Sequence, residues 1–256
     1  MEPSIEASLR QQPLNTKILA SHLMLRVSDL KKGFGSGARR LEVLKGINME
    51  VKTGELVSLM GPSGCGKSTL LNIIGGLLEA DSGEISLDSF DYGTKPPSRV
   101  VDVRRSGVGW IFQDFHLVDR LDALDNVAFS LELSGMSAKE AETRAMDALE
   151  RVGLSDRTNF IPDQLSGGQQ QRVAVARAIS GSRPLILADE PTGNLDVKSG
   201  EDVINLFKDL CANDGLSVLM VTHDPVLASM ADRMLLLKDG ITAASDIRSA
   251  WGIEEE

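Results

Sequence analysis

The segment Gly61–Ser68, GPSGCGKS, constrains the fold of this chain more than any other stretch of its 256 residues. It fits the pattern G-x-x-x-x-G-K-[ST], in which a glycine-rich loop surrounds phosphate oxygens with backbone N–H groups. That pattern needs a strand before the loop and a helix after it. The apolar run Glu55–Met60 and the helical run Lys67–Leu78 meet this requirement. The segment therefore predicts a phosphate site in an α/β core.

The residue types in this loop indicate a nucleoside triphosphate as the ligand. Lys67 would place a cation on the β- and γ-phosphates, and the hydroxyl of Ser68 would bind Mg²⁺. The predicted ligand-binding residues are consecutive: Gly61, Pro62, Ser63, Gly64, Cys65, Gly66, Lys67, Ser68 and Thr69.

Two adjacent acids end the apolar run Leu185–Glu190, LILADE. Asp189 would hold the magnesium, and Glu190, pointing in another direction, would act as general base on the attacking water. Taken alone, two acids at a strand end are more often solvated surface groups. Downstream of a phosphate loop, the catalytic interpretation is favoured.

The remaining apolar runs predict an α/β fold with a mostly parallel sheet. Short runs separated by helical stretches are typical of such a sheet covered by helices. The strands of this core are predicted at 55–60, 108–112, 185–188 and 217–222, with a terminal hairpin at 235–244. Before them, the runs 23–27, 41–44 and 47–51 predict a small antiparallel sheet. Between 114 and about 172 the pattern is helical, with a capping box at Ser137–Glu140, so a helical subdomain is inserted into the core.

Composition excludes several classes of protein. The formal charge of -10 argues against a broad contact with nucleic acid. Two cysteines, Cys65 and Cys211, are too few for a disulfide framework, and the first residues lack the basic start and apolar core of a secretory signal. No apolar run reaches the length that spans a bilayer. We expect a cytoplasmic protein that would reach a membrane only through another chain.

A second glycine-containing segment, Asp163–Arg172 (DQLSGGQQQR), has no nucleophile or metal cluster of its own. Ser166 and Gln169 form a capping box that predicts the start of a helix. Gly167 and Gly168 leave the N–H groups of that first turn accessible, and the helix dipole favours an anion there.

With these motifs the chain resembles the ATP-binding-cassette (ABC) ATPases. Their signature LSGGQ is present at Leu165–Gln169, upstream of LILADE. The resemblance runs from about residue 23 to about residue 244 and implies ATP and Mg²⁺ as cofactors. It implies a role in catalysis and in holding magnesium for Gln113 of IFQDF, γ-phosphate contact for His223 of VTHD, nucleotide contact for Asp196 of TGNLD, and stacking on adenine for Phe34.

The resemblance also implies a head-to-tail homodimer. In such dimers the signature of one subunit closes on ATP held by the phosphate loop of the other, so Ser166, Gly167, Gly168 and Gln169 would meet a nucleotide bound in trans. A twofold pair makes two such sites from one sequence.

Two functions fit an ABC ATPase. The first is the ATP-hydrolysing subunit of a transporter, which drives a separate transmembrane permease from the inner face of the cell membrane. The alternative is a soluble ABC ATPase that acts in translation, DNA repair or chromosome structure. Those relatives carry two cassettes, long coiled coils or zinc modules, which this sequence lacks, so transport is favoured.

Within the transporters, LLNIIGGLL and DEPTGNLD are similar to the lipoprotein-releasing, macrolide-efflux and cell-division group. The segment DFHLVDRLDALDNV after Gln113 departs from that group's pattern and is expected to face the membrane partner. We predict one ABC domain at 21–246, with its helical subdomain at about 114–172, a flexible tail at 1–20 and a C-terminal tail at 247–256.

Overall fold

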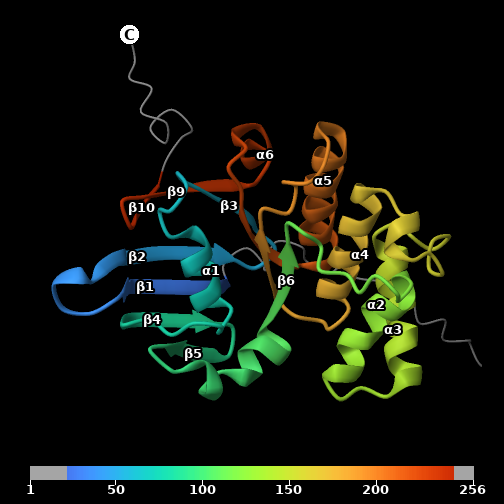
Figure 1. The fold of residues 1–256 in the computed structure, drawn as a ribbon, viewed down its shortest axis with the longest axis horizontal. Helices are drawn as coiled ribbons and strands as arrows, with labels where there is room; N and C mark the ends of the chain where they lie inside the picture. Colours follow the sequence, from blue (N-terminus) through green and yellow to red (C-terminus); the bar gives the residue numbers. More distant parts are fainter. Residues whose placement is uncertain (1–21, 245–256) are drawn as a thin grey trace, which may run out of the picture.

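The computed structural model of the chain describes residues 22–244. The tails predicted at 1–20 and 247–256 lie outside the described residues. Figure 1 shows two β-sheets and a group of helices set to one side of them.

The core is a six-stranded sheet in the order β10-β9-β3-β8-β7-β6. Its neighbouring strands are parallel except for the β9–β10 hairpin, which is antiparallel. The strands are β3 (Leu56–Met60), β6 (Val108–Phe112), β7 (Leu185–Asp189), β8 (Ser217–Val221), β9 (Arg233–Lys238) and β10 (Ile241–Ala244). Every residue of β3 and of β8 is buried, as expected for central strands with helices or a second sheet on both faces. The predicted parallel core and terminal hairpin are confirmed.

A four-stranded antiparallel sheet, in the order β2-β1-β4-β5, packs beside this core. Its strands are β1 (Leu23–Phe34), β2 (Leu41–Lys52), β4 (Ser82–Leu87) and β5 (Phe90–Gly93). The antiparallel sheet predicted from three short runs is confirmed, but two of those runs, 41–44 and 47–51, belong to one long strand. A short 3-10 helix, Gly37–Arg39, occupies the connection between β1 and β2.

The helices are α1 (Lys67–Ile74), α2 (Ala123–Leu133), α3 (Ala138–Arg151), α4 (Gly167–Ile179), α5 (Val197–Asp214) and α6 (Pro225–Ser229). Shorter turns lie at Pro97–Arg99, Val103–Gly107 and Pro162–Gln164. Helix α1 ends four residues before the predicted Leu78, because Gly75 and Gly76 interrupt it. A Cβ at Gly75 would lie 2.0 Å from the ring of Trp110, so this helix end requires glycine.

The stretch between β6 and β7, all of it described, contains helices and no strand, as predicted. Helices α2, α3 and α4 pack on one another, and the alanine-rich stripe of α3 is buried. The predicted boundary near Arg172 falls inside α4, which continues to Ile179 and packs on the core strand β6. The capping box predicted at Ser137 is only half formed: Ser137 Oγ accepts from the backbone N–H of Glu140, whose carboxylate pairs with Arg144 instead.

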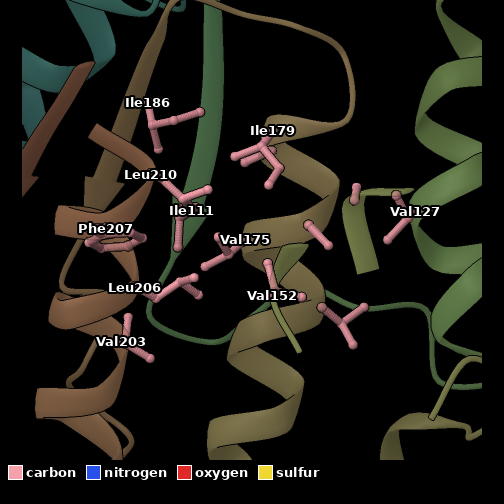
Figure 2. Packing of buried hydrophobic residues seen from close by; sticks show 14 of the residues in the cluster. Ile111, Val127, Val152, Val175, Ile179, Ile186, Val203, Leu206, Phe207 and Leu210 are labelled. Carbon is pink, nitrogen blue, oxygen red and sulfur yellow. The ribbon is translucent and has the colours of Figure 1, made fainter. Parts of the chain in front are cut away.

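The two faces of the six-stranded sheet belong to different hydrophobic clusters. Alternate side chains, such as Ile186 and Val218, pack with α4 and α5, as Figure 2 shows around Val175, Phe207 and Leu210. The intervening side chains, such as Leu187 and Leu219, pack with α1 and the antiparallel sheet. Helices α1 and α4 therefore lie on opposite faces of one sheet.

Candidate active site

The phosphate loop connects β3 to α1, as the sequence predicts. Gly66 is the N-cap of α1 and has φ 107°, a left-handed conformation that residues with a Cβ rarely adopt. A Cβ at Gly61 would lie 2.2 Å from the carbonyl oxygen of Leu237 on the neighbouring strand. Both glycines are thus required by backbone geometry, which supplies the compact loop that a phosphate group needs.

The ammonium group of Lys67 is held by its own loop. Its Nζ donates to the carbonyl oxygens of Gly61 at 2.7 Å and Pro62 at 3.1 Å. Neutral carbonyl groups are weaker partners for an ammonium than charged phosphate oxygens are. Lys67 can therefore exchange these bonds for phosphate contacts without leaving the loop.

The register of the sheet aligns the ends of four parallel strands. Phe112, Asp189, Val221 and Leu59 lie side by side across β6, β7, β8 and β3. The phosphate loop, Gln113, Glu190 and His223 all follow these positions within two residues. Ligands of open α/β sheets bind at this carboxyl edge. The structure thus brings the predicted phosphate loop and three predicted catalytic side chains to one edge.

Glu190 and His223 are in direct contact. Nδ1 of His223 lies 2.8 Å from Oε2 of Glu190, and the backbone N–H of His223 points to the same oxygen at 3.3 Å. The Glu190 side chain is 20% exposed and the His223 side chain 73% exposed. Glu190 also has φ 49°, in the left-handed region, and its backbone N–H donates to Val221. The backbone therefore directs the carboxylate toward His223, a pairing that the sequence did not reveal.

Gln113 is fixed by a residue that sequence reasoning missed. Its Nε2 donates to Oδ1 of Asn194 at 3.2 Å, and Nδ2 of Asn194 donates to the carbonyl oxygen of Gln113 and to Asp114. Asn194 lies in the motif TGNLD, for which the sequence predicted a role only for Asp196. The amide nitrogen of Gln113 is engaged, which leaves its Oε1 as the atom that could bind a cation.

Asp196, predicted to contact nucleotide, is the N-cap of α5. Its carboxylate accepts from the backbone N–H of Ser199 at 3.0 Å and from the Ser199 hydroxyl at 2.6 Å. These hydrogen bonds lower the pKa of the Asp196 carboxyl below its ordinary value. Its role within the chain is therefore to start a helix.

The predicted capping box of the signature segment is complete. Oγ of Ser166 accepts from the backbone N–H of Gln169, and Oε1 of Gln169 accepts from the backbone N–H of Ser166. The two glycines differ in their surroundings. A Cβ at Gly168 would lie 3.3 Å from Ser199, whereas one at Gly167 would meet only ordinary contacts near Leu195. A side chain at position 168 would therefore be tight against Ser199, whereas one at position 167 fits within the chain.

The predicted site residues fall into two groups. Lys67 belongs to α1, on one face of the sheet, and Ser166 caps α4, on the other face. Phe34 ends β1, and its ring is partly exposed beside the ammonium of Lys32, 5.7 Å from the ring centroid.

The donors predicted for Mg²⁺ are all oxygen atoms: the Ser68 hydroxyl, the Asp189 carboxylate and the Gln113 amide. Mg²⁺ prefers oxygen and is usually held by one or two carboxylates together with substrate phosphates. Residues 22–244 hold no group of three or more His, Cys, Asp or Glu side chains that could form a cage for a metal. A set with one carboxylate thus fits an ion that a nucleotide helps to hold.

Comparisons with known proteins agree with this geometry. A protein-family model described as ABC transporter matches residues 44–193. The uncharacterized ABC transporter ATP-binding protein YvrO of Bacillus subtilis is 45% identical over 217 residues, which cover 85% of this chain and 94% of that protein. The macrolide export ATP-binding/permease protein MacB of Escherichia coli K12 is 43% identical over 85% of this chain, which spans 33% of MacB.

A similar fold occurs in a solved structure of the ATP-binding cassette MJ0796 from Methanocaldococcus jannaschii, a dimer in a post-hydrolysis state bound to ADP and Pi. The TM-score is 0.75 and the identity 41%, over 86% of this chain and 98% of that one. Within residues 22–244, no helix is both long and apolar enough to cross a membrane.

Proposed function

The chain belongs to the ABC transporter ATP-binding proteins, and we propose that two copies close head to tail around two ATP molecules to drive a separate transmembrane permease. Binding and hydrolysis of ATP follow from the family. The head-to-tail arrangement, the role of each residue, the use of Mg²⁺ and the permease are the proposal. Nucleic acid is not expected as a partner.

One observation supports a nucleotide site that two subunits share. Helices α1 and α4 lie on opposite faces of the six-stranded sheet, so Lys67 and the accessible turn at Gly167 cannot readily enclose one nucleotide within a single chain. A second copy related by a twofold axis supplies the missing turn to each phosphate loop, and two equal sites result. The solved MJ0796 cassette is itself described as dimeric and bound to ADP and Pi, which supports the same arrangement here.

Each residue at the carboxyl edge of the sheet then has its own role in ATP hydrolysis. Lys67 and the N–H groups of the loop bind the phosphates, and Glu190 accepts the proton of the water that attacks the γ-phosphate. His223 holds the carboxylate of Glu190 in place and would also contact the γ-phosphate. Mg²⁺, when bound by Ser68, Asp189 and Gln113, would neutralise charge on the phosphates.

We propose transport rather than a soluble ABC function because the similar proteins include a macrolide exporter in which the cassette and the permease form one protein. Here the permease would be another chain, and the protein would be cytoplasmic, at the inner face of the membrane. The segment 114–127, which departs from the pattern of the group, is the part that we expect to contact this permease.

The shared site is tested with heterodimers whose two subunits are joined by a flexible peptide linker, so that the subunits cannot exchange. In the trans arrangement, one subunit carries Lys67→Ala and the other Gly167→Asp, so one composite site has both defects and the other is intact. In the cis arrangement, a subunit with both substitutions is paired with an unsubstituted one, so each site carries one defect. The two heterodimers therefore contain the same substitutions.

We expect ATP hydrolysis from the trans heterodimer and almost none from the cis heterodimer. Aspartate is well tolerated in the first turn of a helix, but its charge repels phosphate. Gly167→Asn, of the same size without the charge, separates repulsion from crowding. Equal activity of the trans and cis heterodimers would refute a site shared between subunits.

A further inference from the structure

The carboxylate of Asp81 binds groups at the end of β1 and in the connection that leads to β2. It accepts from the backbone N–H of Gly33 at 2.6 Å and from Nζ of Lys32 at 3.3 Å, and it pairs with the guanidinium of Arg40. The backbone N–H of Asp81 also donates to the carbonyl oxygen of Lys31. A single side chain therefore fixes the end of β1 against Arg40, the residue just before β2.

This end of β1 is where Phe34 is placed. The ladder between β1 and β2 has an irregularity between Lys32 and Gly33, where the register shifts by one residue. The Gly33 N–H bonds to Asp81 at this irregularity. Gly33 also makes room for Arg40, because a Cβ there would lie 3.0 Å from Nε of Arg40. The backbone just before Phe34 is thus held by Asp81.

Lys32 connects the carboxylate to the aromatic ring. The residue is only 9% exposed, and its ammonium lies over the Phe34 ring, 5.7 Å from the centroid. This distance is within the range of a cation–π contact. One face of the ring is therefore occupied by Lys32, while the Phe34 residue as a whole stays 44% exposed.

General stabilisation explains only part of this cluster. The Asp81–Arg40 pair is exposed enough to solvent that it contributes little to the folding free energy, whereas the buried Lys32 needs a carboxylate partner. Burial acts to raise the pKa of Asp81, but the bond from Gly33 and the charge of Lys32 outweigh it, so the pKa lies below its ordinary value. Asp81 is therefore ionised at neutral pH. Its hydrogen-bond partners Lys32 and Gly33 directly precede Phe34.

We propose that Asp81 is a positioning residue for the adenine base: it holds Lys32 and Gly33 so that the Phe34 ring presents its free face to the nucleotide. This inference rests on the proposed function, in which Phe34 stacks on adenine. Asp81 touches no nucleotide atom in this proposal and acts only through the ring.

The test compares ATP with inorganic tripolyphosphate, which lacks the base, by calorimetric titration in the presence of a chelator. We expect Phe34→Ala to weaken ATP binding about tenfold, in the range of base–aromatic stacking. Asp81→Asn keeps the shape but removes the charge, and should weaken ATP binding by about threefold to tenfold. Tripolyphosphate binding should stay unchanged in both variants. Glu84→Gln, an exposed carboxylate on β4, is the matched control and should change neither ligand.

The doubly substituted protein, Asp81→Asn with Phe34→Ala, should bind ATP no more weakly than Phe34→Ala alone, because both act through the ring. Additive losses, or an unchanged ratio of ATP to tripolyphosphate affinity in Asp81→Asn, would overturn the proposal. If Asp81→Asn does not fold, Lys32→Met removes the cation from the ring and must lower the same ratio.

Lys67→Ala separates this proposal from the proposed function. The function requires that Lys67→Ala weaken both ATP and tripolyphosphate. If it does so while Asp81→Asn leaves the affinity ratio unchanged, only the positioning role is wrong. If Lys67→Ala weakens neither ligand, the phosphate site itself is wrong, and the positioning role fails with it.

Discussion

Nδ1 of His223 lies 2.8 Å from Oε2 of Glu190 at the carboxyl edge of the sheet. The histidine ring is mostly exposed and the carboxylate mostly covered. His223 thus faces solvent, where a partner subunit and a nucleotide would bind, and Glu190 lies inside the candidate site. The two residues are expected to act together.

Glu190→Gln should keep ATP binding and lose hydrolysis. The amide has nearly the shape of the carboxylate but cannot accept a proton, and loss of a general base typically costs about 10²-fold to 10⁴-fold in rate. Steady-state phosphate release measures the loss, and gel filtration with ATP should reveal a trapped dimer. Hydrolysis near the unsubstituted rate would show that another group is the base.

The contact between His223 and Glu190 predicts that their substitutions have coupled effects on hydrolysis. His223→Ala alone should slow turnover, and adding it to Glu190→Gln should cause little further loss, because residues in one hydrogen-bonded unit are not additive. Rates of the two single variants and the double variant measure this coupling. Independent, multiplying losses would mean that His223 acts without Glu190.

Thiol reagents should inactivate the protein through Cys65. Cys65 is half buried in the phosphate loop, whereas burial raises the pKa of Cys211 to about 12, with a contribution from the charges of Asp232 and Glu55. Thiolates are the reactive form, so Cys211 should be inert at neutral pH. We expect ATP to protect against maleimide, and Cys65→Ala to be insensitive. Equal sensitivity of Cys65→Ala would place the reactive thiol elsewhere.

Asn126→Ala should destabilise the protein by about 2 kcal/mol, since it leaves buried polar groups without a partner. Asn126 is 3% exposed, and its amide bonds to backbone groups of Val118, Leu121 and Asp122 in the segment after Gln113. Chemical denaturation measures the change. Glu132→Ala, an exposed position on the same helix, should change the unfolding free energy by much less; an equal change would contradict this account.

The cap at Asp196 predicts a dependence of stability on acid pH. The folded pKa of Asp196 lies below its ordinary value, so the ionised cap stabilises the protein above the unfolded pKa, and this contribution is lost as pH falls through the folded value. Asn at the same position keeps an N-cap acceptor without titrating. Melting temperatures between pH 6 and about pH 3 should therefore fall less steeply for Asp196→Asn. Parallel curves would mean that Asp196 titrates alike in both states.

Local patterns in the sequence predicted most of the fold and the members of the candidate site. The phosphate loop, the acids of LILADE and the capping box at Ser166 each depend on residues close together in the chain, so spacing alone located them. The alternation of short apolar runs and helices predicted the parallel core for the same reason.

Tertiary structure decided which of these residues meet. The contact of Glu190 with His223 depends on strand register and on a left-handed backbone at Glu190. The bond from Gly33 to Asp81 joins residues 48 positions apart in the sequence. Gly168 shows the same limit: its neighbour Ser199 comes from another helix, so only the packing of the two helices shows how little space a side chain has there. Hydrophobic periodicity shows which face of a helix or strand is buried. Contacts between elements depend on strand register and close packing, which no short sequence pattern encodes.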